Sequence, residues 1–172
     1  HIIARLKDVY GNYWIRTLMG LGIYNSNLRL LYFTAHNEPY KSTPEYWFSN
    51  FMVPDRQGSV WYFTRDGIQQ VMRKEKLFKV HDPDSWGQSY FFDLFADSRD
   101  SVWAAGLDGL YLFNRNLQQF TLQFGDGINR AGHPYETTAI YKDSRDILWI
   151  GSTHNGLLRL NNPDDPENKF MK

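Results

Sequence analysis

The sequence predicts an all-β fold made of four similar sheets, and three observations favour it. Aromatic residues make up 17% of the 172 residues, a fraction that favours packed aromatic layers over a helical bundle. The apolar runs are only a few residues long and rich in aromatic and β-branched residues, as is typical of strands. A tryptophan also recurs in similar surroundings, at Trp14, Trp61, Trp103 and Trp149, about 42 to 47 residues apart.

An acidic turn comes before each tryptophan. The four acids are Asp8, Asp55, Asp97 and Asp143. A carboxylate at this place can accept hydrogen bonds from the next backbone amides and so start a turn. The third residue after each acid is Gly11, Gly58, Asp100 or Asp146. Both residue types tolerate the positive φ that closes a hairpin, so we expect the same turn in all four copies.

Each repeat provides four strands around this turn. The first is the apolar run before the acid, the second contains the tryptophan, and the third begins at a glycine a few residues later. Runs such as "LRLLYF" form the fourth strand, for which the last repeat offers only "NKFM" at residues 168–171. The predicted antiparallel sheets span about residues 1–34, 47–81, 90–124 and 137–172.

A four-stranded sheet cannot cover both of its own faces. Sheets stacked radially bury these faces and leave only short edges, which is the arrangement of a β-propeller. The four repeats therefore predict propeller blades, with each tryptophan in the gap between two blades. An aromatic side chain of this size buries roughly 150–250 Å², so we expect the tryptophans to serve packing rather than catalysis.

The repeated unit is D-x-x-G-x-x-W-x-x-T-x-x-G-L, clearest at residues 8–21 and 55–68, and it resembles the two-component-regulator propeller repeat. All four units together cover essentially the whole chain. The resemblance implies a β-propeller sensor region outside the inner membrane of a bacterial signalling protein. It also implies an output domain elsewhere, usually a histidine kinase and sometimes a diguanylate cyclase, and a ligand that is often a small saccharide.

Single copies depart from this pattern. Asp100 and Asp146 replace the first glycine, and Gly106 replaces the small hydroxyl residue. The fourth unit also has one extra residue before Gly156, while the periodicity of the repeat is kept. The resemblance also implies rings of about seven blades, so four repeats predict a partial propeller.

Composition excludes several classes of partner. Nineteen basic and nineteen acidic residues cancel, so no overall field attracts nucleic acid. The apolar runs are too short to cross a bilayer, so we expect no direct membrane insertion of this segment. The chain has no cysteine and its five histidines are scattered, so the sequence predicts no metal site and no cofactor.

The loops that join successive blades carry most of the unrepeated chemistry. They span residues 35–46, 82–89 and 125–136, and we expect them to share one face with the turns between second and third strands. Aromatic faces and hydrogen-bond donors in these segments suit a sugar. The candidate ligand-binding residues are His36, Tyr40, Arg65, Asp66, Trp86, Asp108, Arg130, His133, Tyr135, His154 and Asn155. We expect alanine at Trp86 or Tyr135 to weaken binding with little loss of stability.

These features predict a non-catalytic, ligand-sensing segment of a membrane-bound receptor, in the periplasm or otherwise outside the cytoplasm. No nucleophile motif occurs, so no catalytic residue is assigned. Two alternatives stay open. Two rim carboxylates could meet in space and make the chain part of a propeller glycosidase or polysaccharide lyase. Propeller rims also suit a protein-binding scaffold.

The expected partners are a small-molecule or oligosaccharide ligand and further sheets. We expect the first blade, around Trp14, and the last, around Trp149, each to expose a sheet face. Such apolar faces drive association. The sequence therefore predicts either self-association or further propeller blades in a longer chain.

Overall fold

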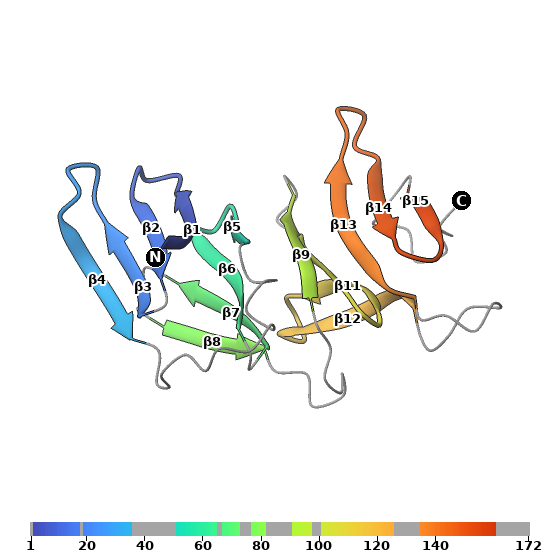
Figure 1. Ribbon diagram of the computed structural model, residues 1–172, viewed down its shortest axis with the longest axis horizontal. Coiled ribbons are helices and arrows are strands. Elements are labelled where there is room, and N and C mark those ends of the chain that lie inside the picture. The colour runs from blue at the N-terminus through green and yellow to red at the C-terminus, as the bar shows by residue number, and fades with distance from the viewer. Residues whose placement is uncertain are drawn as a thin grey trace. The chain divides into compact units, whose positions relative to one another are not determined.

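The computed structural model describes residues 2–17, 19–35, 51–64, 67–72, 77–81, 91–97, 101–125 and 135–160. These residues form four antiparallel sheets whose strands follow one another in chain order, which confirms the all-β fold and the predicted propeller blades (Figure 1). No helix in these ranges is long and apolar enough to cross a membrane. The chain divides into two compact units, residues 1–80 and 81–172, and each is treated separately below.

The first unit contains two four-stranded sheets. The first sheet is β1 (Ile2–Lys7), β2 (Tyr13–Thr17), β3 (Gly20–Tyr24) and β4 (Leu30–Ala35). The second sheet is β5 (Met52–Pro54), β6 (Ser59–Thr64), β7 (Gly67–Met72) and β8 (Leu77–His81).

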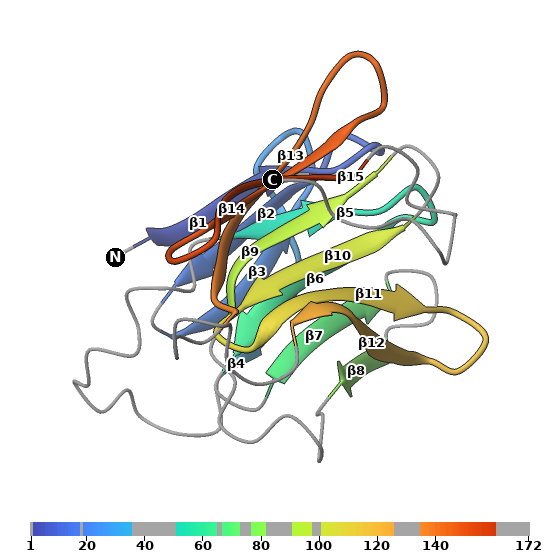
Figure 2. The same ribbon diagram turned by 90° about the vertical axis from the view of Figure 1, so that its right-hand side faces the viewer.

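The second unit contains a four-stranded and a three-stranded sheet. The third sheet is β9 (Phe91–Ala96), β10 (Val102–Gly106), β11 (Gly109–Asn114) and β12 (Gln119–Gly125), which lie side by side in this order (Figure 2). The fourth sheet is β13 (Thr137–Lys142), β14 (Leu148–Ser152) and β15 (Gly156–Leu160). The fourth strand predicted at residues 168–171 lies outside the described residues.

The acidic turns have the expected geometry. Asp8 Oδ1 accepts hydrogen bonds from the backbone N–H groups of Tyr10 and Asn12, each at 2.9 Å. The turn-closing residues Gly11, Gly58 and Asp146 have φ of 81°, 84° and 64°, as predicted. Asp100 lies outside the described residues.

A second carboxylate oxygen fixes the tryptophan in three of the four repeats. Trp14 Nε1 donates to Asp8 Oδ2 at 2.9 Å. The same bond joins Trp61 to Asp55 at 2.9 Å and Trp149 to Asp143 at 3.1 Å. Each turn is therefore tied to the side chain six residues later, which sets the orientation of the indole on its strand.

These bonds change the acidity of Asp8 and Asp143. Burial raises the pKa of Asp143, but hydrogen bonds from Trp149, Ile147 and Arg145 outweigh it and lower the value to about 2. Burial also opposes ionisation of Asp8, and donors from Trp14, Asn12 and Tyr10 lower its pKa below 3.8. The turns at Asp8 and Asp143 are thus built around ionised carboxylates.

In the first unit the tryptophan side of one sheet packs on the tryptophan-free side of the next. Ala4, Trp14, Leu21 and Ile23 form one core cluster with Met52, Val60, Tyr62 and Val71. Trp14 is fully buried, so the face that the first sheet leaves uncovered is the face opposite Trp14. The Arg16 guanidinium also lies 5.2 Å from the Tyr62 ring centroid. Burial raises the pKa of Tyr62 to about 12, although Arg16 opposes the shift.

In the second unit the tryptophan side of one sheet again packs on the tryptophan-free side of the next. Trp103, Ala105 and Leu110 of the third sheet form a core cluster with apolar residues of the fourth sheet. The fourth-sheet residues are Ile140, Leu148, Ile150, Leu158 and Leu160. Leu148 and Ile150 flank Trp149 in β14 and so lie on the face opposite it. In both units, therefore, the repeated tryptophan points toward the following sheet, as the sequence predicted for the gap between blades.

We predict that three of the repeated tryptophans differ in their contribution to stability. Trp14→Ala and Trp103→Ala each empty a buried site and should lower the free energy of unfolding by about 3–5 kcal/mol. Trp149→Ala is the matched control, because Trp149 has the same place in its repeat but is only half-buried. Chemical denaturation measures the difference, and equal losses at all three positions would contradict the packing polarity.

A second prediction concerns acid stability. Because folding lowers the pKa of Asp143 from 3.8 to about 2, its ionised form stabilises the fold above pH 3.8, and this contribution is lost as the pH falls toward 2. Asp143→Asn cannot accept the same set of hydrogen bonds. Thermal unfolding should show the variant less stable than the parent at pH 6 and nearly equal to it at pH 2. A stability difference between parent and variant that stays constant from pH 6 to pH 2 would contradict the assignment of this pKa shift to Asp143.

Candidate functional site

The loop end of the second unit is the end where the chain enters the first strand of each sheet. Thr137, the first residue of β13, is fully buried there. Its Oγ1 donates to the Gly109 carbonyl oxygen at 2.7 Å and accepts from Gly106 N–H at 3.1 Å. These bonds hold the start of the fourth sheet against the β10–β11 turn, which contains Asp108.

Two glycines bring the end of β12 onto the same turn. Gly109 and Gly125 face each other in the register, with φ of 139° and 132°. A Cβ on Gly125 would lie 2.2 Å from the Asp108 carbonyl oxygen, and a Cβ on Gly109 would lie 2.0 Å from the Phe124 carbonyl oxygen. Only glycine permits this approach, which places Asp108 beside the strand that leads into the third inter-blade loop.

Tyr135 and Glu136 connect this region to the β14–β15 turn. The Tyr135 ring packs edge-on against Phe124, with centroids 5.2 Å apart. The Glu136 carbonyl oxygen accepts a hydrogen bond from Thr153 N–H at 3.2 Å. The turn that follows Ser152 exposes His154 and buries Asn155. Asn155 donates from its backbone N and its Nδ2 to Ser152 Oγ, at 3.2 and 3.3 Å, and so fixes the shape of the turn.

The structure thus places four of the candidate residues, Asp108, Tyr135, His154 and Asn155, at one end of the second unit. The other seven lie outside the described residues, namely His36, Tyr40, Arg65, Asp66, Trp86, Arg130 and His133. A ligand contact for any of the eleven stays a prediction. The Tyr135 ring also packs on Phe124, so alanine at Tyr135 would remove this packing in addition to any effect on ligand binding.

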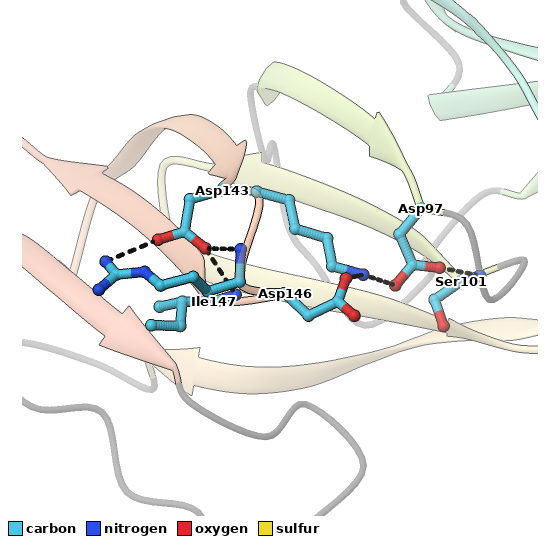
Figure 3. A network of polar contacts seen from close by, with 7 residues as sticks. Asp97, Ser101, Asp143, Asp146 and Ile147 are labelled. Carbon is cyan, nitrogen blue, oxygen red and sulfur yellow. Dashed lines mark hydrogen bonds and ion pairs between the residues drawn. The ribbon is translucent and has the colours of Figure 1, made fainter.

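At the opposite, aspartate end of the same unit, a buried lysine joins the third and fourth sheets. Its two partners, Asp97 and Asp146, are labelled in Figure 3. Lys142 Nζ lies 2.8 Å from Asp146 Oδ1 and 3.4 Å from Asp97 Oδ2. The Lys142 and Asp97 side chains are only 8% and 2% exposed, whereas Asp146 is 73% exposed. Asp97 Oδ1 accepts from Ser101 N–H at 3.0 Å, as the first oxygen does in the other turns.

For this ion pair Asp97 uses Oδ2, the carboxylate oxygen that accepts the indole N–H in the other three repeats. Asp97 Oδ2 faces Lys142, and Trp103 Nε1 is buried without a hydrogen-bond partner within the described ranges. Sequence reasoning missed Lys142, and the repeat gives no signal for it. Lys7 occupies the same place before its acid, yet it is exposed and lies 5.4 Å from the Tyr13 ring centroid. Two features distinguish the two lysines: Asp146 stands where the first repeat has Gly11, and the preceding sheet supplies Asp97.

The carboxylates with described environments mainly hold the fold. Asp93 Oδ2 accepts from Ile140 N–H at 2.8 Å and so joins the third sheet to the fourth. Burial raises the pKa of Asp93, although backbone hydrogen bonds from Ile140 and Leu94 oppose the shift. The part of the chain that the structure describes contains no group of three or more potential metal ligands.

The fold and its repeated sheets define the chain as a β-propeller segment. Its structure matches an extracellular domain described as part of the hybrid two-component system BT3049 from B. thetaiotaomicron, with a TM-score of 0.67 and 20% identity over 95% of this chain. An extracellular domain described as part of the one-component system BT4673, from the same organism, gives 0.65 and 17% over 96%. These matches confirm the fold that the repeat resemblance implies.

The same fold also occurs in an enzyme. A catalytically inactive virginiamycin B lyase from Staphylococcus aureus, with quinupristin, matches with a TM-score of 0.70 and 11% identity over 99% of this chain. The chain spans 22% and 21% of the two extracellular domains and 54% of the lyase. No family model and no curated protein matches the sequence.

The buried ion pair gives a third prediction. Lys142→Met leaves Asp97 buried without its cation and should lower the free energy of unfolding by about 3 kcal/mol. The double variant Lys142→Met/Asp97→Asn should lose less than the sum of the single variants, because the charge is then removed as well. Lys7→Met is the control at the equivalent exposed position, where a change within about 0.5 kcal/mol is expected. Additive losses in chemical denaturation would refute the coupling.

Proposed function

We propose that the chain is a non-catalytic, ligand-sensing propeller segment of a bacterial membrane-bound signalling receptor, located outside the cytoplasm. The observation that carries the proposal is the match with extracellular domains of two signalling systems over at least 95% of this chain. The repeat pattern independently resembles the two-component-regulator propeller family. Fold similarity alone is compatible with many functions, so the site chemistry has to supply the rest.

The loop end supports recognition of a polar ligand such as an oligosaccharide. Its described part combines an exposed imidazole at His154, a half-buried ring at Tyr135 and the half-buried Asp108. These groups come from three separate segments that hydrogen bonds and the paired glycines hold in place. Aromatic rings with hydrogen-bonding groups around them provide the stacking and polar contacts that sugars require.

Five of the described carboxylates are engaged in the fold, which favours sensing over glycoside hydrolysis, while Asp108 and Glu136 lie at the loop end. Hydrolysis needs two carboxyl groups facing a substrate, one of them able to give up a proton. Asp8, Asp55 and Asp143 instead accept hydrogen bonds from turn amides and an indole. Asp97 and Asp93 connect the third sheet to the fourth.

Lyase activity is the second candidate, because virginiamycin B lyase has a closely similar backbone. The two functions predict different fates for the ligand. A sensor binds its ligand and releases it unchanged, whereas a lyase converts it to product.

The fourth prediction tests both candidates in one experiment. Titration with a panel of oligosaccharides should raise the Tm for at least one of them, since a ligand that binds only the folded state stabilises it by mass action. For His154→Ala we expect a smaller rise in Tm, corresponding to a dissociation constant about tenfold higher. Asn116→Ala, in the exposed β11–β12 turn at the aspartate end, is the matched control and should bind like the parent.

At position 135 we use the variant Tyr135→Phe and not Tyr135→Ala, because phenylalanine keeps the ring against Phe124 and removes only the hydroxyl. Mass spectrometry of the same mixtures, and of a mixture with quinupristin, shows whether any ligand is cleaved. Conversion of any ligand to product would overturn the sensor proposal and favour the enzyme. Binding by neither kind of ligand would contradict both proposals and favour a protein-binding scaffold.

A further inference from the structure

One buried hydrogen-bond donor of the second unit has no acceptor. The Trp103 side chain is 1% exposed, and its Nε1 makes no hydrogen bond within the described ranges. A buried N–H group without an acceptor is unfavourable, because it has given up its bond to water. The equivalent indoles avoid this cost, since Trp14, Trp61 and Trp149 each donate to the aspartate six residues earlier.

The acceptor that Trp103 would use is bonded to another side chain. Asp97 has the same place in its repeat as the other turn aspartates, and its Oδ1 accepts from Ser101 N–H at 3.0 Å. Its Oδ2, the oxygen that accepts the indole in the other repeats, lies 3.4 Å from Lys142 Nζ. An ammonium and an indole N–H therefore compete for one carboxylate oxygen.

Lys142 has a second carboxylate that can hold it. Its Nζ lies 2.8 Å from Asp146 Oδ1, which is closer than the 3.4 Å to Asp97 Oδ2. The Asp146 side chain is 73% exposed, so it has room to follow the ammonium. Lys142 can therefore leave Asp97 and keep a counter-ion. With Asp97 as its single partner it could not, because an unpaired buried charge is strongly destabilising.

Two arrangements of these side chains follow. In the lysine-bound arrangement, which the structure shows, Asp97 Oδ2 holds Lys142 and the indole is unpaired. In the indole-bound arrangement, Asp97 Oδ2 accepts Trp103 Nε1, as in the other three repeats, and Lys142 stays on Asp146. One bond to Asp97 replaces the other, and Lys142 keeps a carboxylate partner in both arrangements.

We propose that Asp97 Oδ2 alternates between Lys142 and the Trp103 indole, which makes the Lys142–Asp97 ion pair a releasable connection between the third and fourth sheets. Its release opens the connection at the aspartate end only. Thr137 at the loop end and the bond from Ile140 N–H to Asp93 still hold the two sheets together. The proposal depends on neither the ligand nor the sensor function.

Two variants should push the exchange in opposite directions. Lys142→Met removes the competing donor, so Asp97 Oδ2 should accept the indole in every molecule. Asp146→Gly removes the second carboxylate of Lys142 and should hold the ammonium on Asp97. Glycine suits this turn, because Gly11 and Gly58 have the same place in their repeats and the same positive φ as Asp146.

Nuclear magnetic resonance of the indole N–H groups measures the exchange, because a hydrogen bond moves the proton resonance to lower field. Trp103→Phe assigns the Trp103 signal. In Lys142→Met this signal should move downfield into the range of the bonded indoles of Trp14 and Trp61. In Asp146→Gly it should move the other way. The parent should lie between the two variants or show both signals, because it populates both arrangements.

Two controls separate the hydrogen bond from other effects of the substitutions. Lys142→Met/Asp97→Asn should lack the downfield shift, because the amide keeps one oxygen for the turn and has a donor nitrogen in place of the second oxygen. Lys7→Met, at the equivalent exposed position of the first repeat, should leave the Trp103 signal unchanged.

A parent Trp103 signal already in the range of Trp14 and Trp61 would overturn the proposal, because the indole would then be bonded with the lysine in place. A Lys142→Met signal that coincides with the parent signal would overturn it too, as would a double variant that shifts like the single one. If Lys142→Met does not fold, Asp146→Gly decides, since a Trp103 signal identical to that of the parent would show that no exchange occurs.

Discussion

A hydrogen bond from an indole to an aspartate six residues earlier is the interaction on which this structure depends. It uses both ends of one carboxylate, since one oxygen accepts turn amides while the other accepts the tryptophan N–H. The turn therefore fixes a large side chain on the adjacent strand. Because the bond occurs in the same form at Asp8, Asp55 and Asp143, every one of these sheets presents its tryptophan from the same side.

This constraint gives the stack of sheets a direction. A sheet with its indole fixed on one side has two different faces, and within each unit the tryptophan face meets a face without tryptophan. In the third repeat the tryptophan also faces the following sheet, but it does so without the indole–aspartate hydrogen bond. Asp97 turns its second oxygen to Lys142 of the next sheet, so a bond inside one sheet is exchanged for an ion pair between two. A buried pair of this kind specifies which sheet follows, at the cost of leaving the Trp103 N–H unpaired.

The two ends of the second unit have divided roles as a result. The aspartate end is occupied by turn bonds and by the Lys142 network, which leaves its charged groups engaged in the fold. The loop end is held instead by Thr137 and by the close approach of Gly109 and Gly125, which use backbone atoms. Side chains such as His154 thereby remain at the surface, on segments that vary between repeats, which is where we propose ligand recognition.

The sequence by itself determined the repeat, the strands and the acidic turns, because these depend on local spacing. An aspartate three residues before a glycine, or before a residue that tolerates positive φ, makes the same turn wherever it occurs. What only the tertiary structure decided is which sheet lies beside each side chain. Lys7 and Lys142 both stand directly before the turn aspartate, and Asp146 near Lys142 replaces Gly11, yet only the preceding sheet supplies the Asp97 against which Lys142 is buried while Lys7 is exposed. The two faces of the first sheet were also indistinguishable in the sequence, since burial of Trp14 follows from the neighbouring sheet and not from the repeat that contains it.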